Sequence, residues 1–189
     1  MVKRVSARFY EMDSDNPQDE GDVVNRSVPS ITTAIGKRLS SKNEPYDMHD
    51  VLLVRYYLHI AGGSSNRGGG GHPTNPALRS TPDELNDTRN TPELEKKIKV
   101  FQQMGPNIAT DGRVSVPPGN SFAFLGSASA AGVKQGNGYI DNGRATTFTM
   151  VLLVEYWGMR SSQAKLPMVV SQQRDCPDEL RAALRRISL

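Results

Sequence analysis

Cysteine is almost missing from this chain of 189 residues, which has a single one at position 176. One cysteine excludes an intramolecular disulfide framework. Long apolar runs are missing as well, because none reaches the ~18 residues that a membrane-spanning helix needs. Residues 1–10 alternate apolar and basic side chains without the apolar centre of a signal peptide. We therefore expect no membrane partner and synthesis in the cytoplasm, with export only by a route that cleaves no signal, or with assembly into a larger particle.

An excess of charge of one sign is also lacking. The chain has 23 Lys and Arg against 20 Asp and Glu, which leaves a formal net charge of +3. This small excess is spread along the chain, whereas a nucleic-acid-binding protein typically gathers its basic residues in a patch. Hydrophobic residues make up 37% of the chain, which allows a core. We expect one domain with extensions and no nucleic-acid partner.

Motifs for metal, nucleotide and covalent chemistry are absent from the sequence. His49, His59 and His72 have no ligand spacing with each other or with Cys176, whereas zinc needs three or four converging ligands. The glycine-rich stretch 62–72 is not followed by the lysine and hydroxyl residue of a phosphate-binding loop. No glycine-flanked serine elbow is present. We expect no metal, no cofactor and no enzymatic activity.

The clearest pattern that is present predicts a helix beginning after Thr91. Thr91 can cap it, Pro92 suits its first turn, and two glutamates place negative charge at the positive end of the helix dipole. Its apolar stripe consists of Leu94, Ile98 and Phe101. Gly105 and Pro106 end the helix, and a tight turn follows in which Gly112 takes a positive φ.

A second apolar stretch, 50–61, is interrupted only by Arg55 and His59. Its length and its ends favour a buried helix that Asp50 opens and Gly62 and Gly63 close. A buried strand is the alternative, because the valines and tyrosines of this stretch also favour sheet. We expect the apolar stripe of the 91–104 helix to pack against Val51, Val54 or Leu58.

Three motifs together resemble the peptidoglycan-binding-domain-like family. IKVFQ at 98–102, followed by DGRVSVPPG at 111–119, is similar to the family's helix and following turn, and DVLLVRYYL at 50–58 is similar to its first core helix. The similarity covers residues 31–119. It departs at Arg55 and Tyr56, where the family has Val-Gln, and at 75–90, which replaces the family's aspartate-glycine turn.

This resemblance implies a noncatalytic module that binds the glycan or the peptide of peptidoglycan. The ligand would lie in a groove between the 50–61 and 91–104 helices, where Tyr56 or Tyr57 could stack on a sugar. Gln102 and Arg113 could donate hydrogen bonds to the same ligand. The alternative is that one tyrosine and Phe101 belong to the core and the other residues are ordinary surface.

The sequence before and after these two helices indicates strands, loops and a further helix. Residues 2–10 alternate as in a half-buried strand, and 31–39 fit either a short helix or an extended segment against the core. Residues 119–143, rich in Gly, Ala and Ser, predict a long loop or ordered coil. Acidic residues open and basic residues end a predicted helix at 177–189.

The strongest strand candidate is 146–157, with 165–171 as its partner across a turn. Its sequence VLLVEYW at 151–157 is also similar to VLLVRYY at 51–57. If this similarity is a true repeat, the two segments are copies of one helix. As a strand, this segment would pack on the core and leave an edge for a second copy or another protein.

We therefore expect an α+β protein in which a small helical peptidoglycan-binding-like core carries a C-terminal β-containing extension and a terminal helix. The expected parts are an N-terminal strand and loop extension (1–30), the helical core (31–119) and a segment packed on it (120–189). The first expected function is noncatalytic peptidoglycan binding. The second is a structural or adaptor role in a phage or an injection or secretion apparatus, with self or other proteins as partners through the C-terminal β segment.

Overall fold

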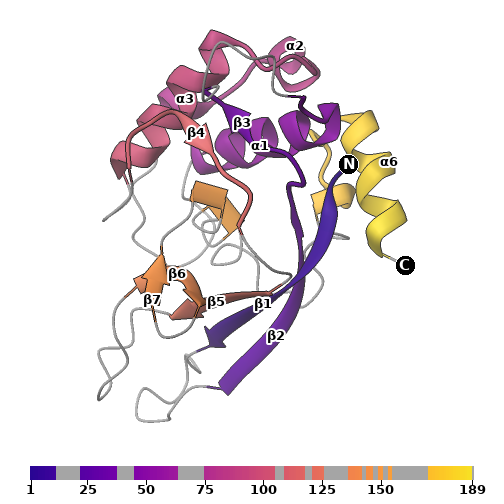
Figure 1. Cartoon of the computed structure of the whole chain (residues 1–189). Coiled ribbons are helices and arrows are strands. Elements are labelled where there is room, and N and C mark those ends of the chain that lie inside the picture. Colours follow the sequence, from indigo (N-terminus) through magenta and orange to yellow (C-terminus); the bar gives the residue numbers. More distant parts are fainter. Residues whose placement is uncertain are drawn as a thin grey trace.

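The computed structural model describes residues 1–11, 22–37, 45–63, 75–104, 109–117, 121–125, 136–141, 144–146, 149–150, 153–154 and 170–188. These residues form helices and small sheets, which confirms a mixed α+β architecture. In Figure 1, α1, α2 and α3 lie together at the top of the molecule, and the larger sheet lies at the opposite end.

The larger sheet has five strands in the order β2-β1-β5-β6-β7. Their bounds are β1 Lys3–Glu11, β2 Asp22–Ser30, β5 Ser121–Leu125, β6 Gly136–Asp141 and β7 Arg144–Thr146. β1 pairs antiparallel with β2 along its whole length and parallel with β5, and the remaining pairs are antiparallel. The predicted strand at 2–10 is confirmed.

The loop or coil predicted at 119–143 is wrong where the structure describes this segment, because β5 and β6 lie within it. Glycine, alanine and serine have little intrinsic preference for strands. The parallel pairing with β1, more than one hundred positions earlier in the chain, supplies the hydrogen-bonding partner that no local pattern reveals.

Helix α1 spans Met48–Ala61, so the helical prediction for 50–61 is confirmed and its strand alternative is wrong. It begins earlier than predicted, because Asp47 is the N-cap and its side chain accepts from the backbone N–H of His49. Asp50, predicted to open the helix, is buried within its first turn. Its Oδ2 accepts hydrogen bonds of 2.8–2.9 Å from the N–H and hydroxyl groups of Thr32 and Thr33.

Helix α3 spans Pro92–Met104, and the hydroxyl of Thr91 accepts from the N–H of Leu94, as the sequence predicts. The stop at Gly105 and Pro106 lies outside the described residues. Between α1 and α3 lie the 3-10 helix η1 (Pro76–Leu78) and the one-turn helix α2 (Pro82–Leu85). Helix α6 spans Asp178–Ser188 and confirms the predicted terminal helix.

Two short strands pair with each other, one before α1 and one after α3 in the sequence. β3 (Ile35–Gly36) pairs antiparallel with β4 (Arg113–Val114), so the helix alternative for 31–39 is wrong in the described part of that segment. Gly112 has a φ of 76°, as predicted, and Gly36 has a φ of 92°. A Cβ on Gly36 would lie 2.1 Å from the carbonyl oxygen of Gly112, so only glycine permits this close approach.

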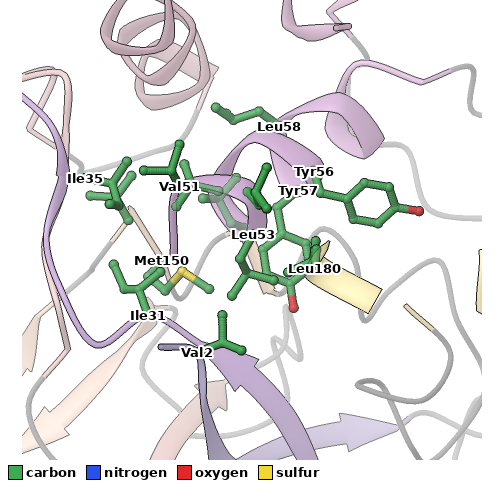
Figure 2. Close-up of a cluster of buried hydrophobic side chains, with 14 of the residues drawn as sticks. Val2, Ile31, Ile35, Val51, Leu53, Tyr56, Tyr57, Leu58, Met150 and Leu180 are labelled. Atoms are coloured by element: carbon green, nitrogen blue, oxygen red, sulfur yellow. The ribbon is translucent and has the colours of Figure 1, made fainter. Parts of the chain in front are cut away.

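One core unites the three predicted parts of the chain. Leu94, Ile98 and Phe101 are buried, and α3 contacts α1, as predicted. The same core contains Val2, Val5 and Val28 from the N-terminal strands and Met150, Leu153, Val154, Leu180 and Leu184 from the C-terminal third. Figure 2 shows Val2, Ile31 and Met150 on one side of α1 and Leu180 beside the ring of Tyr57.

The strand predicted at 146–157 is wrong in most of its described residues. Only Thr146 belongs to a strand, whereas Thr149, Met150, Leu153 and Val154 are helical and buried. Its predicted partner at 165–171 is also helical where it is described, at positions 170 and 171. A short apolar run fits a buried helix as well as a buried strand, so the sequence pattern alone did not separate the two.

Trp157, the end of that predicted strand, lies outside the described residues. Leu153 and Val154 are helical and buried, as are Leu53 and Val54 at the corresponding positions of α1. The repeat itself stays a prediction. No helix in the described part of the chain is long and apolar enough to cross a membrane.

Candidate binding site

The four residues predicted to bind a ligand do not line an open groove. Tyr56, Tyr57 and Gln102 have 0%, 1% and 1% of their surface exposed, and Arg113 is half-buried. Figure 2 shows the ring of Tyr57 within the apolar cluster and the ring of Tyr56 pointing away from it. A ligand-binding role for these four residues stays a prediction. Tyr57 belongs to the core, and the other three make the polar contacts described below.

Gln102 holds the turn between α3 and β4. Its Oε1 accepts from the N–H of Gly112 at 2.8 Å, and its Nε2 lies 2.9 Å from Asp111 Oδ1 and 3.0 Å from the carbonyl oxygen of Arg113. The same Nε2 is 2.9 Å from the hydroxyl of Thr149. The Phe-Gln and Asp-Gly-Arg-Val motifs thus form one structural unit, in which the buried amide satisfies the polar groups of the turn.

The side chain of Arg113 extends from this turn toward the end of β3. Its Nη1 donates a 2.9 Å hydrogen bond to the carbonyl oxygen of Lys37, beyond the end of β3. The backbone N–H of Lys37 in turn donates to the carbonyl oxygen of Gly112 at 2.8 Å. The arginine therefore ties the β3 segment to the turn.

Arg55 is a buried cation that organises the loop before α3. Its Nη2 donates to the carbonyl oxygen of Arg89 at 2.9 Å and lies 3.3 Å from the hydroxyl of Thr91 and 3.5 Å from Asp87 Oδ2. Burial lowers the pKa of the Arg55 guanidinium, which the nearby carboxylate of Asp87 opposes. The carboxylate that faces this buried cation comes from Asp87, in the segment 75–90 between α1 and α3.

Asp175 connects the segment before α6 to the last two turns of α1. The hydroxyl of Tyr56 donates to Asp175 Oδ1 at 2.9 Å, and His59 Nε2 lies 3.4 Å from Asp175 Oδ2. The N–H of Ser80 donates to His59 Nδ1 at 3.0 Å, so the neutral imidazole carries its proton on Nε2, facing the carboxylate. Burial and the negative charge of Asp175 raise the pKa of Tyr56 well above its usual range, so Tyr56 remains a donor.

A pocket opens beside this aspartate, between α2 and the start of α6. Its volume is about 300 Å³, which is the lower end of the range for small-molecule sites. We call it the α2–α6 pocket. It is lined by Pro82, Leu85, Asn86, Arg174, Asp175, Cys176, Pro177, Asp178 and Arg181.

The charged side chains of the α2–α6 pocket divide into fixed and available groups. Arg181 is fixed, because its Nη2 donates to the carbonyl oxygens of Gln173 and Cys176 at 3.1 and 2.9 Å, and its Nη1 pairs with Asp178 at 2.9 Å. Arg174 is exposed, and among the described residues its side chain has no hydrogen bond or ion pair. The pocket thus presents a guanidinium and carboxylate oxygens to an incoming ligand.

Cys176 lies in the wall of the α2–α6 pocket but is not a nucleophile at neutral pH. Its thiol is buried, and burial raises its pKa to about 12. Only the thiolate attacks electrophiles or binds soft metals. In the described part of the chain, no group of three or more His, Cys, Asp or Glu side chains could hold a metal ion.

The sequence pattern did not identify this pocket. Arg174, Asp175 and Asp178 belong to no motif, and they face α2 only because the chain returns to the end of α1 after more than one hundred residues. The one local signal was the predicted helix start near position 177. Long-range packing supplied the rest of the site.

No known protein family matches the sequence, and neither do curated proteins or solved structures. The resemblance to peptidoglycan-binding-like domains therefore stays a prediction, and the function is proposed from the residues of this chain.

Proposed function

We propose that this chain is a noncatalytic module that binds peptidoglycan, with the α2–α6 pocket as the binding site. The observation that carries the proposal is the pocket itself. It has a volume of about 300 Å³, an apolar part formed by Pro82, Leu85 and Pro177, and charged groups of both signs around it. A concave site with a few oriented polar groups is typical of small-ligand recognition.

Ligand binding without catalysis agrees with the protonation and the contacts of the side chains around the pocket. The Cys176 thiol stays protonated at neutral pH, and the His59 ring is held between the N–H of Ser80 and the carboxylate of Asp175. The contacts between Gln102 and the Asp111–Gly112 turn add support. They link the Phe-Gln and Asp-Gly-Arg-Val motifs, which are the motifs that resemble peptidoglycan-binding-like domains.

Sedimentation with purified peptidoglycan sacculi tests this proposal. We expect the full chain to sediment with the sacculi and Arg174→Ala to sediment less, because Arg174 is the available cation of the pocket. Arg185→Ala is the matched control, since Arg185 is an exposed arginine of α6 outside the pocket lining. A full chain that stays in the supernatant, or an Arg185→Ala defect equal to that of Arg174→Ala, would contradict the proposal.

The second candidate is a structural or adaptor role, and one observation favours it. β2 is nine residues long and stands at one end of the sheet order, where β1 is its only partner among the described strands. An edge strand of this length can accept another strand. The segment 146–157, first predicted to offer a strand edge to a partner, is helical in most of its described residues. In this second candidate the assembly surface is therefore the edge strand β2.

Light scattering after size-exclusion chromatography separates the two candidates when combined with the sedimentation assay. A monomer that sediments with sacculi supports the binding module. A chain that forms oligomers and ignores sacculi supports the structural role, and a proline introduced at Val24 in β2 should then reduce assembly, because proline cannot donate to a strand pair.

A further inference from the structure

We infer that the α2–α6 pocket recognises the peptide part of peptidoglycan in preference to its sugars. The inference rests on the proposed function and deepens it by naming the ligand class. It follows from which kinds of side chain line the pocket and from which of their polar groups are already engaged.

The lining lacks what an uncharged sugar ring needs. None of the nine lining residues that the structure describes is aromatic. Aromatic rings offer the broad apolar face on which sugar rings commonly stack, together with a polar edge. Tyr56, the tyrosine that approaches the pocket, is buried, and its hydroxyl is engaged by Asp175. A sugar would therefore find hydrogen-bonding groups here without a stacking surface.

The available groups match a ligand that carries both signs of charge. Arg174 can bind a carboxylate through two parallel N–H donors, the geometry in which arginine binds carboxylates most strongly. Asp178 is 94% exposed and Asp175 47% exposed, so their outer oxygens can accept from an ammonium or from amide N–H groups. A short peptide supplies the carboxylate, the amides and the ammonium together.

The pocket is also prepared for such a ligand. Asp175 is oriented by Tyr56 and His59, and the backbone of 173–176 is held by Arg181. Holding the acceptor in place before binding reduces the conformational entropy lost in the complex. Arg174 is the one charged lining residue without such support among the described residues, and it would become ordered on binding.

Competition against sacculi tests the inference with the full chain. The first probe is a soluble tetrapeptide with a free α-carboxylate and a lysine-type ammonium, and the second is an N-acetylglucosamine tetramer. We expect the peptide to release the protein from sacculi and the oligosaccharide to leave it bound. Added salt should weaken the peptide's effect, because exposed charges are screened.

Isothermal titration with the tetrapeptide identifies the residue. Arg174→Glu should lower the affinity about tenfold or more, the loss expected for a charged hydrogen bond. Arg174→Lys should bind with intermediate affinity, since it keeps the charge without the paired donors, and Arg185→Glu should bind as the parent does.

Release by the oligosaccharide alone, or by neither probe, would overturn the inference while sacculus binding still upheld the proposed function. A parent chain that binds neither sacculi nor the free peptide would overturn both. Unchanged peptide affinity in Arg174→Glu would show that the peptide binds elsewhere.

Discussion

Burial decides the chemistry of Cys176. With a pKa of about 12, the thiol is ionised in about one molecule in ten thousand at pH 8. We predict that native protein reacts with iodoacetamide or a chromogenic disulfide far more slowly than protein unfolded in guanidinium, where the pKa returns toward its ordinary value. Mass spectrometry of timed samples measures both rates. Rapid alkylation of the native thiol would show that the wall of the α2–α6 pocket opens readily.

Gln102 has a larger structural role than its residue type suggests. Gln102→Ala should lower the free energy of unfolding by about 1–3 kcal/mol, because the buried N–H of Gly112 would lose its acceptor. The neighbouring Gln103 is exposed on the same helix, so Gln103→Ala should change stability little. Urea denaturation of both variants measures the difference. Equal midpoints for the two would show that the turn holds without its amide contact.

At the scale of the helix, Phe101 anchors α3 in the core. Its side chain is fully buried, so Phe101→Ala should cost about 3–5 kcal/mol in unfolding free energy. Lys96→Ala, on the exposed face of α3, is the matched control. Thermal denaturation followed by circular dichroism makes the comparison. A Phe101→Ala protein that melts with the parent would contradict the packing of α3 on α1.

The short helix α2 should make stability depend on acid pH. Hydrogen bonds from the backbone N–H of Thr81 and from Lys97 Nζ hold the pKa of Glu84 below its ordinary value near 4.5. Because the folded-state pKa is lowered, its contribution is present above pH 4.5 and disappears as the pH falls through the folded-state value. Glu84→Gln should therefore lose less stability than the parent between about pH 6 and pH 3.

Urea midpoints measured across that pH range provide the readout for α2. Asp83→Asn, an exposed change in the same turn, should follow the parent. A Glu84→Gln curve parallel to that of the parent would show that the link from α2 to Lys97 on α3 does not contribute to stability.

Elements with strong local signals were predicted well. Thr91 and Pro92 mark the start of α3, and the acidic first turn and basic last turn mark α6. The positive φ of Gly112 was predictable because Asp-Gly at 111–112 is a typical tight-turn sequence. The N-cap of α1 was missed by three positions, because Asp47 and Asp50 are both good capping residues and Asp50 bonds instead to Thr32 and Thr33.

At the scale of the whole molecule, we expect that residues 1–119 do not fold stably without the rest of the chain. Truncation to residues 1–119 would remove β5, the parallel partner of β1, and the core residues Met150, Leu153 and Leu180. We predict a product that is poorly soluble or unfolded, because the remaining apolar surface would face water. Size-exclusion chromatography and one-dimensional proton NMR of the fragment test this. A stable, monomeric fragment would show that residues 31–119 fold as an independent module.

Local sequence by itself determined the helices α1, α3 and α6, the strand β1 and the Asp-Gly turn, because caps, periodicity and glycine stereochemistry act over a few neighbouring residues. The structure decided what depends on distant partners. The segment 149–154 is helical and buried where it is described, although its composition suits a strand equally well. Asp175 becomes the wall of a pocket because Tyr56, 119 positions earlier in the chain, donates to it across the core. Such contacts depend on which surfaces remain to be buried once the elements have formed, and no local pattern records that.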